Sequence, residues 1–253
     1  MTAKSFLKTA HMITRLYMRD FASPFFSVVF PIGMILLFGA IYGNEPSPLF
    51  NYEYGAMDAM IPALIGVTIA VNGIMTLPLN LSEYMANKVY KRFDATPVGK
   101  GSIILVQVLV YLLFALASTA IIIIVGRIIY SINITGAWHI ILAAILLSCA
   151  AIFAMGFLIA AVFKNGKLAQ VVSYIVYFMM LFLSGATMPL ELMPENVRTF
   201  ANILPLTHVV SLLQSTFNGQ PISEWFVAIL VLLGIVIAGG IGGAASYRHR
   251  KWA

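Results

Sequence analysis

Four polar side chains recur at every fourth position within one otherwise apolar stretch. They are Thr68, Asn72, Thr76 and Asn80, and a helix would place all four along one face. Amide and hydroxyl groups in an apolar setting need hydrogen-bond partners, which neighbouring helices commonly supply. The same row could instead form one wall of a translocation path. The spacing fits both interpretations.

A second polar row follows later in the chain, where Tyr174 and Tyr177 lie among Phe and Met side chains. A mixed face of Tyr, Met and Phe suits an amphipathic ligand, although such side chains also simply pack in a core. We take Tyr174 and Tyr177 as candidate path residues together with the first row.

Several kinds of chemistry are disfavoured. No ionisable residue lies in the middle of an apolar stretch, where a proton or ion relay would need one. The sequence contains no His-Glu-x-x-His metal motif, no Gly-x-Ser-x-Gly nucleophile motif and no P-loop. We therefore expect no enzyme, no cofactor and no metal in this chain, and any ATP would be hydrolysed by a partner. The basic residues flank apolar segments instead of forming one patch, so nucleic acid is not an expected partner.

The elements that position these residues are predicted to be transmembrane helices. The chain is 61% hydrophobic and only 9% charged, so the bilayer must serve as its solvent. We predict an all-α polytopic membrane protein, a single domain over residues 1–253. Its six spans are expected at residues 22–43, 59–81, 102–126, 138–163, 168–188 and 223–246. A seventh uncharged stretch, 199–223, contains too many polar residues and helix breakers for a lipid-facing helix.

The distribution of basic residues predicts the orientation. With both termini in the cytoplasm, all of the 15 Lys and Arg residues except Arg127 and Arg198 fall on the cytoplasmic side. Before the first span, residues 4–19 place basic and apolar side chains on opposite faces. This pattern predicts an amphipathic helix lying in the plane of the membrane interface, with a plain basic anchor as the alternative.

Two segments outside the spans are the most informative. The cytoplasmic loop at 84–96 has helical propensity and an apolar edge that could dock in a groove. The outer segment 184–208 is interrupted by prolines yet stays apolar, which predicts a short helical hairpin that re-enters the membrane between spans five and six. In the last span, Gly234/Ala238 and Gly239/Gly243 are small residues four apart, which favours close helix packing.

At these segments the chain resembles the membrane subunits of bacterial ABC exporters of the second type. The resemblance covers the whole length and rests on Glu83 followed by Lys91-Arg92-Phe93 and Ala95-Thr96-Pro97, then on Ser184-Gly185, Met188-Pro189-Leu190, Met193-Pro194 and Leu204-Pro205-Leu206-Thr207. One departure is Ala86-Asn87-Lys88, where the family commonly has a Gly.

The resemblance implies a dimer of permeases in the bacterial cytoplasmic membrane, bound to two ABC-type ATPase subunits that carry ATP and Mg. The ATPase-coupling residues would be Glu83, Tyr90, Lys91, Arg92, Phe93 and Asp94. The outer gate would comprise Met188, Pro189, Leu190, Leu192 and Met193.

The leading hypothesis is ATP-driven export of an amphipathic molecule such as a drug, a peptide or a lipid. A polysaccharide or lipid-linked glycan is the alternative cargo. A passive channel or a structural membrane subunit is the alternative of another class. The sequence does not specify the substrate, the direction of transport, or a homodimer over a heterodimer.

Overall fold

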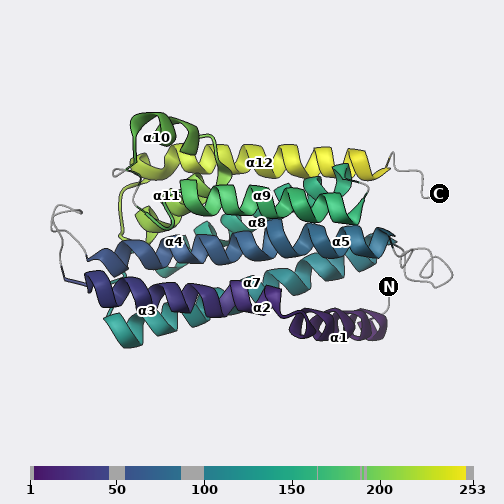
Figure 1. Ribbon diagram of the computed structural model, residues 1–253, viewed down its shortest axis with the longest axis horizontal. Coiled ribbons are helices and arrows are strands. Elements are labelled where there is room, and N and C mark those ends of the chain that lie inside the picture. Colours follow the sequence, from purple (N-terminus) through teal and green to yellow (C-terminus); the bar gives the residue numbers. More distant parts are fainter. Residues whose placement is uncertain are drawn as a thin grey trace.

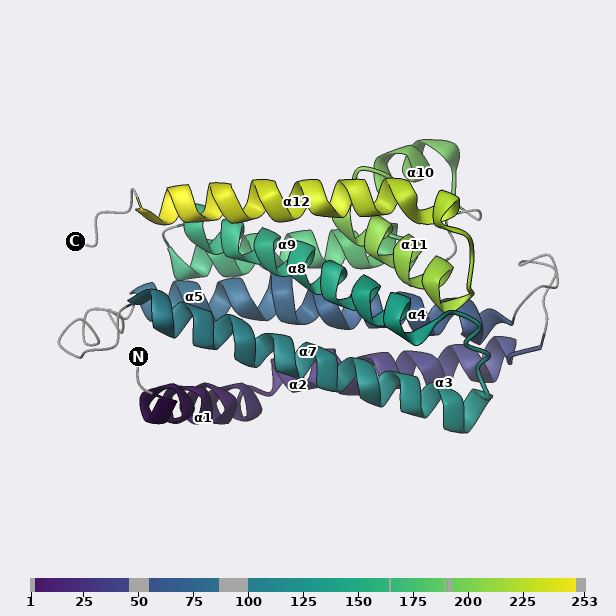
Figure 2. The same cartoon turned by 180° about the vertical axis from the view of Figure 1, so that it is seen from behind.

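The computed structural model describes residues 3–45, 55–86, 100–163, 165–188, 190 and 193–248. The elements of this part are helices that run side by side in one bundle (Figures 1 and 2). Six of them are long and apolar enough to cross a membrane. The predicted all-α fold with six spans is confirmed.

Spans one and two are each built from three consecutive helical pieces, and each has a π-helical turn in the middle. The bounds of the spanning elements, in chain order, are α2 (Ala22–Pro24), η1 (Phe25–Val29) and α3 (Phe30–Tyr42); α4 (Ala56–Ala70), η3 (Val71–Thr76) and α5 (Leu77–Ala86); then α7 (Lys100–Tyr130), α8 (Trp138–Val162), α9 (Gly166–Leu183) and α12 (Ile222–Arg248).

Span two is the centre of the bundle. Its most apolar stretch is entirely buried, whereas only 22% of the corresponding stretch is buried in span one and in span six. The peripheral spans turn large apolar side chains outward, such as Ile41 on α3 and Ile241 on α12. A helix that is apolar all round and exposed on one side is suited to contact with lipid.

Three helices end four or five residues away from the predicted span boundary, and one of them is α5, which continues to Ala86 where the second span was expected to end at 81. Span five was expected over 168–188, but α9 ends at Leu183 because Gly185 has φ +85°, a conformation that residues with a side chain rarely adopt. Span three was expected to end at 126, but α7 continues to Tyr130. Arg127 is accommodated within it at the helix surface, where its guanidinium lies 5.9 Å from the centroid of the Trp138 ring.

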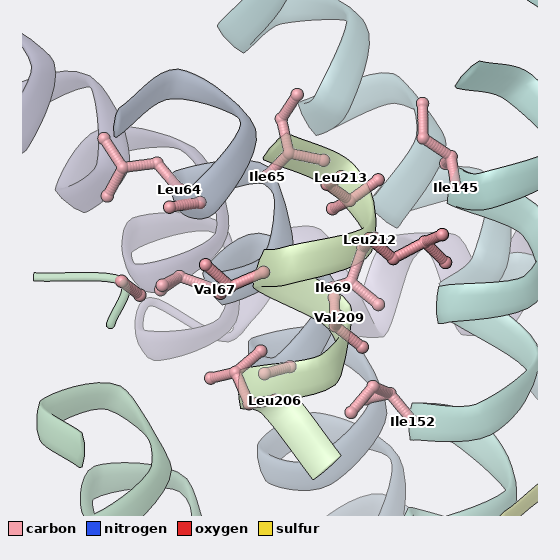
Figure 3. Close-up of a cluster of buried hydrophobic side chains, with 14 of the residues drawn as sticks. Leu64, Ile65, Val67, Ile69, Ile145, Ile152, Leu206, Val209, Leu212 and Leu213 are labelled. Carbon is pink, nitrogen blue, oxygen red and sulfur yellow. The ribbon is translucent and has the colours of Figure 1, made fainter. Parts of the chain in front are cut away.

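Two shorter helices join spans five and six. Pro194 precedes α10 (Glu195–Ala201), and Pro205 is the first residue of α11 (Pro205–Phe217), a position that needs no backbone N–H. Helix α11 packs against α4, α8 and α12, and Figure 3 shows Leu206, Val209, Leu212 and Leu213 among side chains of α4 and α8. The segment between spans five and six is thus helical in part, and the predicted hairpin that re-enters the membrane stays a prediction.

The amphipathic segment is also helical. Helix α1 (Ala3–Arg19) buries Ile13 and Tyr17 and exposes Lys8 and Arg15. It packs beside α7, at the end of the bundle where α5 ends (Figure 1). The connection to span one is fixed by Asp20, whose carboxylate accepts hydrogen bonds from the backbone N–H groups of Ala22 and Ser23. The placement of α1 in the membrane plane stays a prediction.

Glycines allow the central helices to touch backbone to backbone. A Cβ atom on Gly156 of α8 would lie 1.8 Å from the carbonyl oxygen of Gly73 in η3. In α12, Gly239 meets Ala154 and Gly243 meets Phe157, which confirms the predicted packing role of this pair. Gly234 has nothing within 4 Å of such a Cβ, so the same prediction was wrong for the first pair.

We therefore expect Gly156→Ala to destabilise the protein and Gly234→Ala to leave it unchanged or slightly more stable. The methyl group at 156 must push apart two backbones, a cost of about 1–3 kcal/mol for overpacking. At 234 the change gains about 1 kcal/mol of helix propensity. The measurement is the melting temperature of each variant in detergent, and equal melting temperatures for the two variants would contradict this account of the helix crossing.

Candidate functional site

The polar row of span two faces span one. Thr68, Asn72 and Thr76 are all buried. The Asn72 amide nitrogen donates to Ser27 Oγ at 2.8 Å and to the Thr68 carbonyl at 2.9 Å, and Thr76 Oγ1 donates to Ser23 Oγ at 3.1 Å. The row thus has hydrogen-bond partners inside the chain, as the first of the two sequence interpretations proposed. Its role as a wall of the path stays a prediction.

Two further helices reach the same point. The Tyr17 hydroxyl of α1 donates to Asn72 Oδ1 at 2.9 Å, and Ser27 Oγ lies 2.9 Å from Ser118 Oγ on α7. We call Tyr17, Ser27, Asn72 and Ser118 the polar node. All four side chains are buried, so α1 and spans one, two and three share one hydrogen-bonded cluster in an apolar setting.

Prolines explain why the backbone is irregular at the node. Ser27 lies inside η1 and Asn72 inside η3, and a proline follows each π-helical turn two residues later, as Pro31 and Pro78. Proline has no N–H to offer the carbonyl four residues before it. For Pro31 that carbonyl belongs to Ser27, and it accepts a hydrogen bond from Thr68 Oγ1 at 3.3 Å instead.

The other candidate path residues lie apart from this node. Asn80 is half-buried and donates to the Thr76 carbonyl of its own helix at 3.0 Å. Tyr174 is half-buried and accepts from Gln170 at 3.3 Å. Tyr177 is buried, and its hydroxyl has no hydrogen-bond partner among the described residues. In the described part of the chain, no hydrogen bond joins these tyrosines to the row on span two.

Of the predicted ATPase-coupling residues, Glu83 is exposed near the end of α5. Tyr90, Lys91, Arg92, Phe93 and Asp94 lie outside the described residues, so the docking element stays a prediction.

The predicted gate residues differ in burial. Met188 is 44% exposed, whereas Met193 is buried. Leu190 lies against Gly185, where a Cβ would approach its Cγ to 3.0 Å. Pro189 and Leu192 lie outside the described residues. The most deeply packed part of the outer segment is α11, which extends beyond the predicted limit of 208 to Phe217.

The structure also reveals a buried carboxylate that sequence reasoning placed only at a span end. Asp58 accepts hydrogen bonds from the backbone N–H groups of Gly55 and Asn133 and from the Asn44 side chain, at 3.0, 2.9 and 3.1 Å. Asn44 also donates to the Tyr130 carbonyl at 3.1 Å. These bonds tie together the ends of spans one, two and three that lie away from α1 (Figure 1). The sequence signal was Asp58 at the third position of a helix, where it can cap the first turn.

Helix α11 is fixed at the same end of the molecule. Gln214 donates to the Ala59 carbonyl at 3.0 Å, and the N–H groups of Thr135 and Gly136 donate to the Phe217 carbonyl at 3.1 and 3.0 Å. Among the described residues no group of three or more His, Cys, Asp or Glu could hold a metal ion. The arrangement offers hydrogen bonding and close packing between helices.

Comparison with known proteins identifies what the chain is similar to. The family model for ABC-2 type transporters matches residues 8–218. Nodulation protein J of Rhizobium leguminosarum bv. viciae is 37% identical over 71 residues, which are 28% of this chain and 27% of that protein. The match to this relative thus spans about a quarter of its length.

Proposed function

The chain belongs to the ABC-2 type transporter family, and on that premise we propose that it is the permease half of an ATP-driven exporter of an amphipathic molecule. Membrane subunits of this family are transport components, not enzymes, and they normally work with a separate ABC-type ATPase. The observation that carries the proposal is the match over most of a chain that folds into six membrane-spanning helices.

The exposed face of α9 supports an amphipathic cargo. Ile175, Phe178 and Phe182 are exposed there, and the Gln170–Tyr174 hydrogen-bonded pair lies half-buried beside them. Such a face offers apolar contact and polar groups to the same molecule. Phe178 also meets Phe26 of span one edge to face, with ring centroids 6.5 Å apart, so the face extends onto span one.

We further propose that two permeases pair and that the path lies between them. Support comes from span two, whose polar row is enclosed by helices of its own chain, so a path through the bundle centre would have to part those helices. A surface shared by two copies needs no such separation. In this arrangement the half-buried Asn80 and Tyr174 contribute to the path directly, whereas the buried Tyr177, Thr68, Asn72 and Thr76 join it only when the helices around them separate.

The proposed location is the bacterial cytoplasmic membrane with both termini inside. Helix α1, the end of α5 and the end of α12 share one end of the bundle, and α10 lies at the other (Figures 1 and 2). Lys and Arg accumulate on the cytoplasmic side of membrane proteins. Of the 15 Lys and Arg residues of this chain, all except Arg127 and Arg198 belong to sequence segments at the end of the bundle that holds α1. At this interface α1 would lie with Lys8 and Arg15 toward the headgroups.

We propose that residues 84–96 dock the ATPase. The double variant Lys91→Glu/Arg92→Glu reverses two charges in this loop, and about tenfold less ATPase should then co-purify with it. A tenfold decrease corresponds to a loss of about 1.4 kcal/mol of binding free energy. The control is Arg127→Glu/Arg198→Glu, which reverses two charges at the other end of the bundle. A loop variant that recovers as much ATPase as the control would overturn the assignment, as would full recovery after a Gly/Ser linker replaces the loop.

We also propose that the segment around Met188 and Leu192 is the outer gate. The combined substitution Met188→Asn/Leu192→Asn should impair transport or make it leaky without loss of ATPase assembly, because polar groups would weaken an apolar seal. Substrate-stimulated ATP hydrolysis and transport are measured together in the reconstituted complex.

The matched control for the gate is Ile222→Asn, an exposed apolar residue at the start of α12. If the double variant behaves like wild type in both assays, the segment is only a connector. Stimulation by a lipid-linked glycan and not by amphipathic compounds would favour the alternative cargo, and transport that needs no ATP would favour a channel.

A further inference from the structure

The π-helical turns η1 and η3 face each other across the polar node. Ser27 of η1 and Asn72 of η3 are directly hydrogen-bonded, so the irregular turn of span one is joined to the irregular turn of span two. Such turns are uncommon in helices and often mark functional positions. Two of them in contact, each followed by a proline, indicate a shared joint.

The hydrogen bonds at this joint depend on the helix register. A π-helical turn holds one residue more than an α-helical turn, so its conversion to α-helix rotates the helix on one side by about 100°. That rotation would turn Asn72 away from Ser27 and Tyr17. Such a conversion would replace the formed node by an arrangement in which these hydrogen bonds are broken.

Helix α1 holds the joint in its formed arrangement. The Tyr17 ring stacks on Phe114 of α7, with centroids 3.9 Å apart, and lies 5.7 Å from Tyr111. This ring packing aims the hydroxyl at Asn72. Burial raises the pKa of Tyr17 to about 12, so the hydroxyl stays a donor at physiological pH. A second connection runs from Asp20 through Ser23 to Thr76.

We propose that Tyr17 and Asn72 form a latch between α1 and the two π-helical turns, and that opening of this latch during the transport cycle lets spans one and two separate. The inference rests on the proposed function, because the opening serves transport. Tyr17 and Asn72 act as positioning residues. When the latch opens, Thr68, Asn72 and Thr76 lose their partners on span one and become available to the path.

The first test needs no ATPase. In the purified full-length chain, Tyr17→Phe keeps the ring stacking and removes the donor. Amide hydrogen exchange should then rise about tenfold in residues 25–29 and 71–76, the change expected for loss of one buried hydrogen bond. The control is Tyr111→Phe, which removes another buried phenol hydroxyl beside the same ring. Equal exchange in the two variants would overturn the latch.

The second test separates a latch from a structural contact. In the reconstituted complex, Tyr17→Phe should keep ATP hydrolysis and lower the transport per ATP hydrolysed, whereas Tyr111→Phe should change neither. The double variant Tyr17→Phe/Asn72→Leu should be no worse than Asn72→Leu alone, since both lack the same bond. Unchanged transport per ATP in Tyr17→Phe, or losses that multiply in the double variant, would overturn the proposal. If the wild-type complex shows no ATP-driven transport, the proposed function is overturned instead. The hydrogen-exchange measurement would then still test whether Tyr17 stabilises the two π-helical turns.

Discussion

Polar groups in a bilayer find no water, so each one that lacks a hydrogen bond within the protein is costly, and this constraint shapes the arrangement around span two. Span two carries the buried polar row Thr68, Asn72 and Thr76, and it is the helix that the others enclose. Asn72 has both a donor and an acceptor to satisfy, and its partners come from α1, span one and its own helix. The peripheral spans are left free to expose apolar faces to lipid or to a second copy.

The same constraint applies at the end of the molecule away from α1 (Figure 1). Asp58 is buried where spans one, two and three approach each other, and its carboxylate is satisfied by two backbone N–H groups and one side-chain amide. Helix α11 is bonded there through Gln214 and Phe217. Hydrogen bonds around Asp58 join spans one, two and three at this end, whereas η1 and η3 interrupt the regular helix of spans one and two.

Much of this could be predicted from sequence because the signals are local. Uncharged apolar stretches indicated six spans, the spacing of Thr68, Asn72 and Thr76 indicated a common face, and the alternation of basic and apolar residues indicated α1. The rest depends on contacts between distant residues. Tyr17 and Asn72 lie 55 positions apart, and nothing in the sequence pairs them. The early end of α9 depends on the positive φ of Gly185, and the depth of α11 depends on packing with α4, α8 and α12.

The central claim is that six helices cross the membrane with both ends of the chain inside, while α10 and α11 enter and leave on the outer side. Single cysteines at Asn196, Ser223, Asn87 and Asn165, introduced in a Cys149→Ala background, test it directly with an impermeant thiol reagent applied to intact cells. The account predicts labelling from outside at Asn196 and at Ser223, on either side of α11, and no labelling at Asn87 and Asn165. Labelling of only one of the first two would show that α11 crosses the membrane, and external labelling at Asn87 would reverse the orientation of the protein.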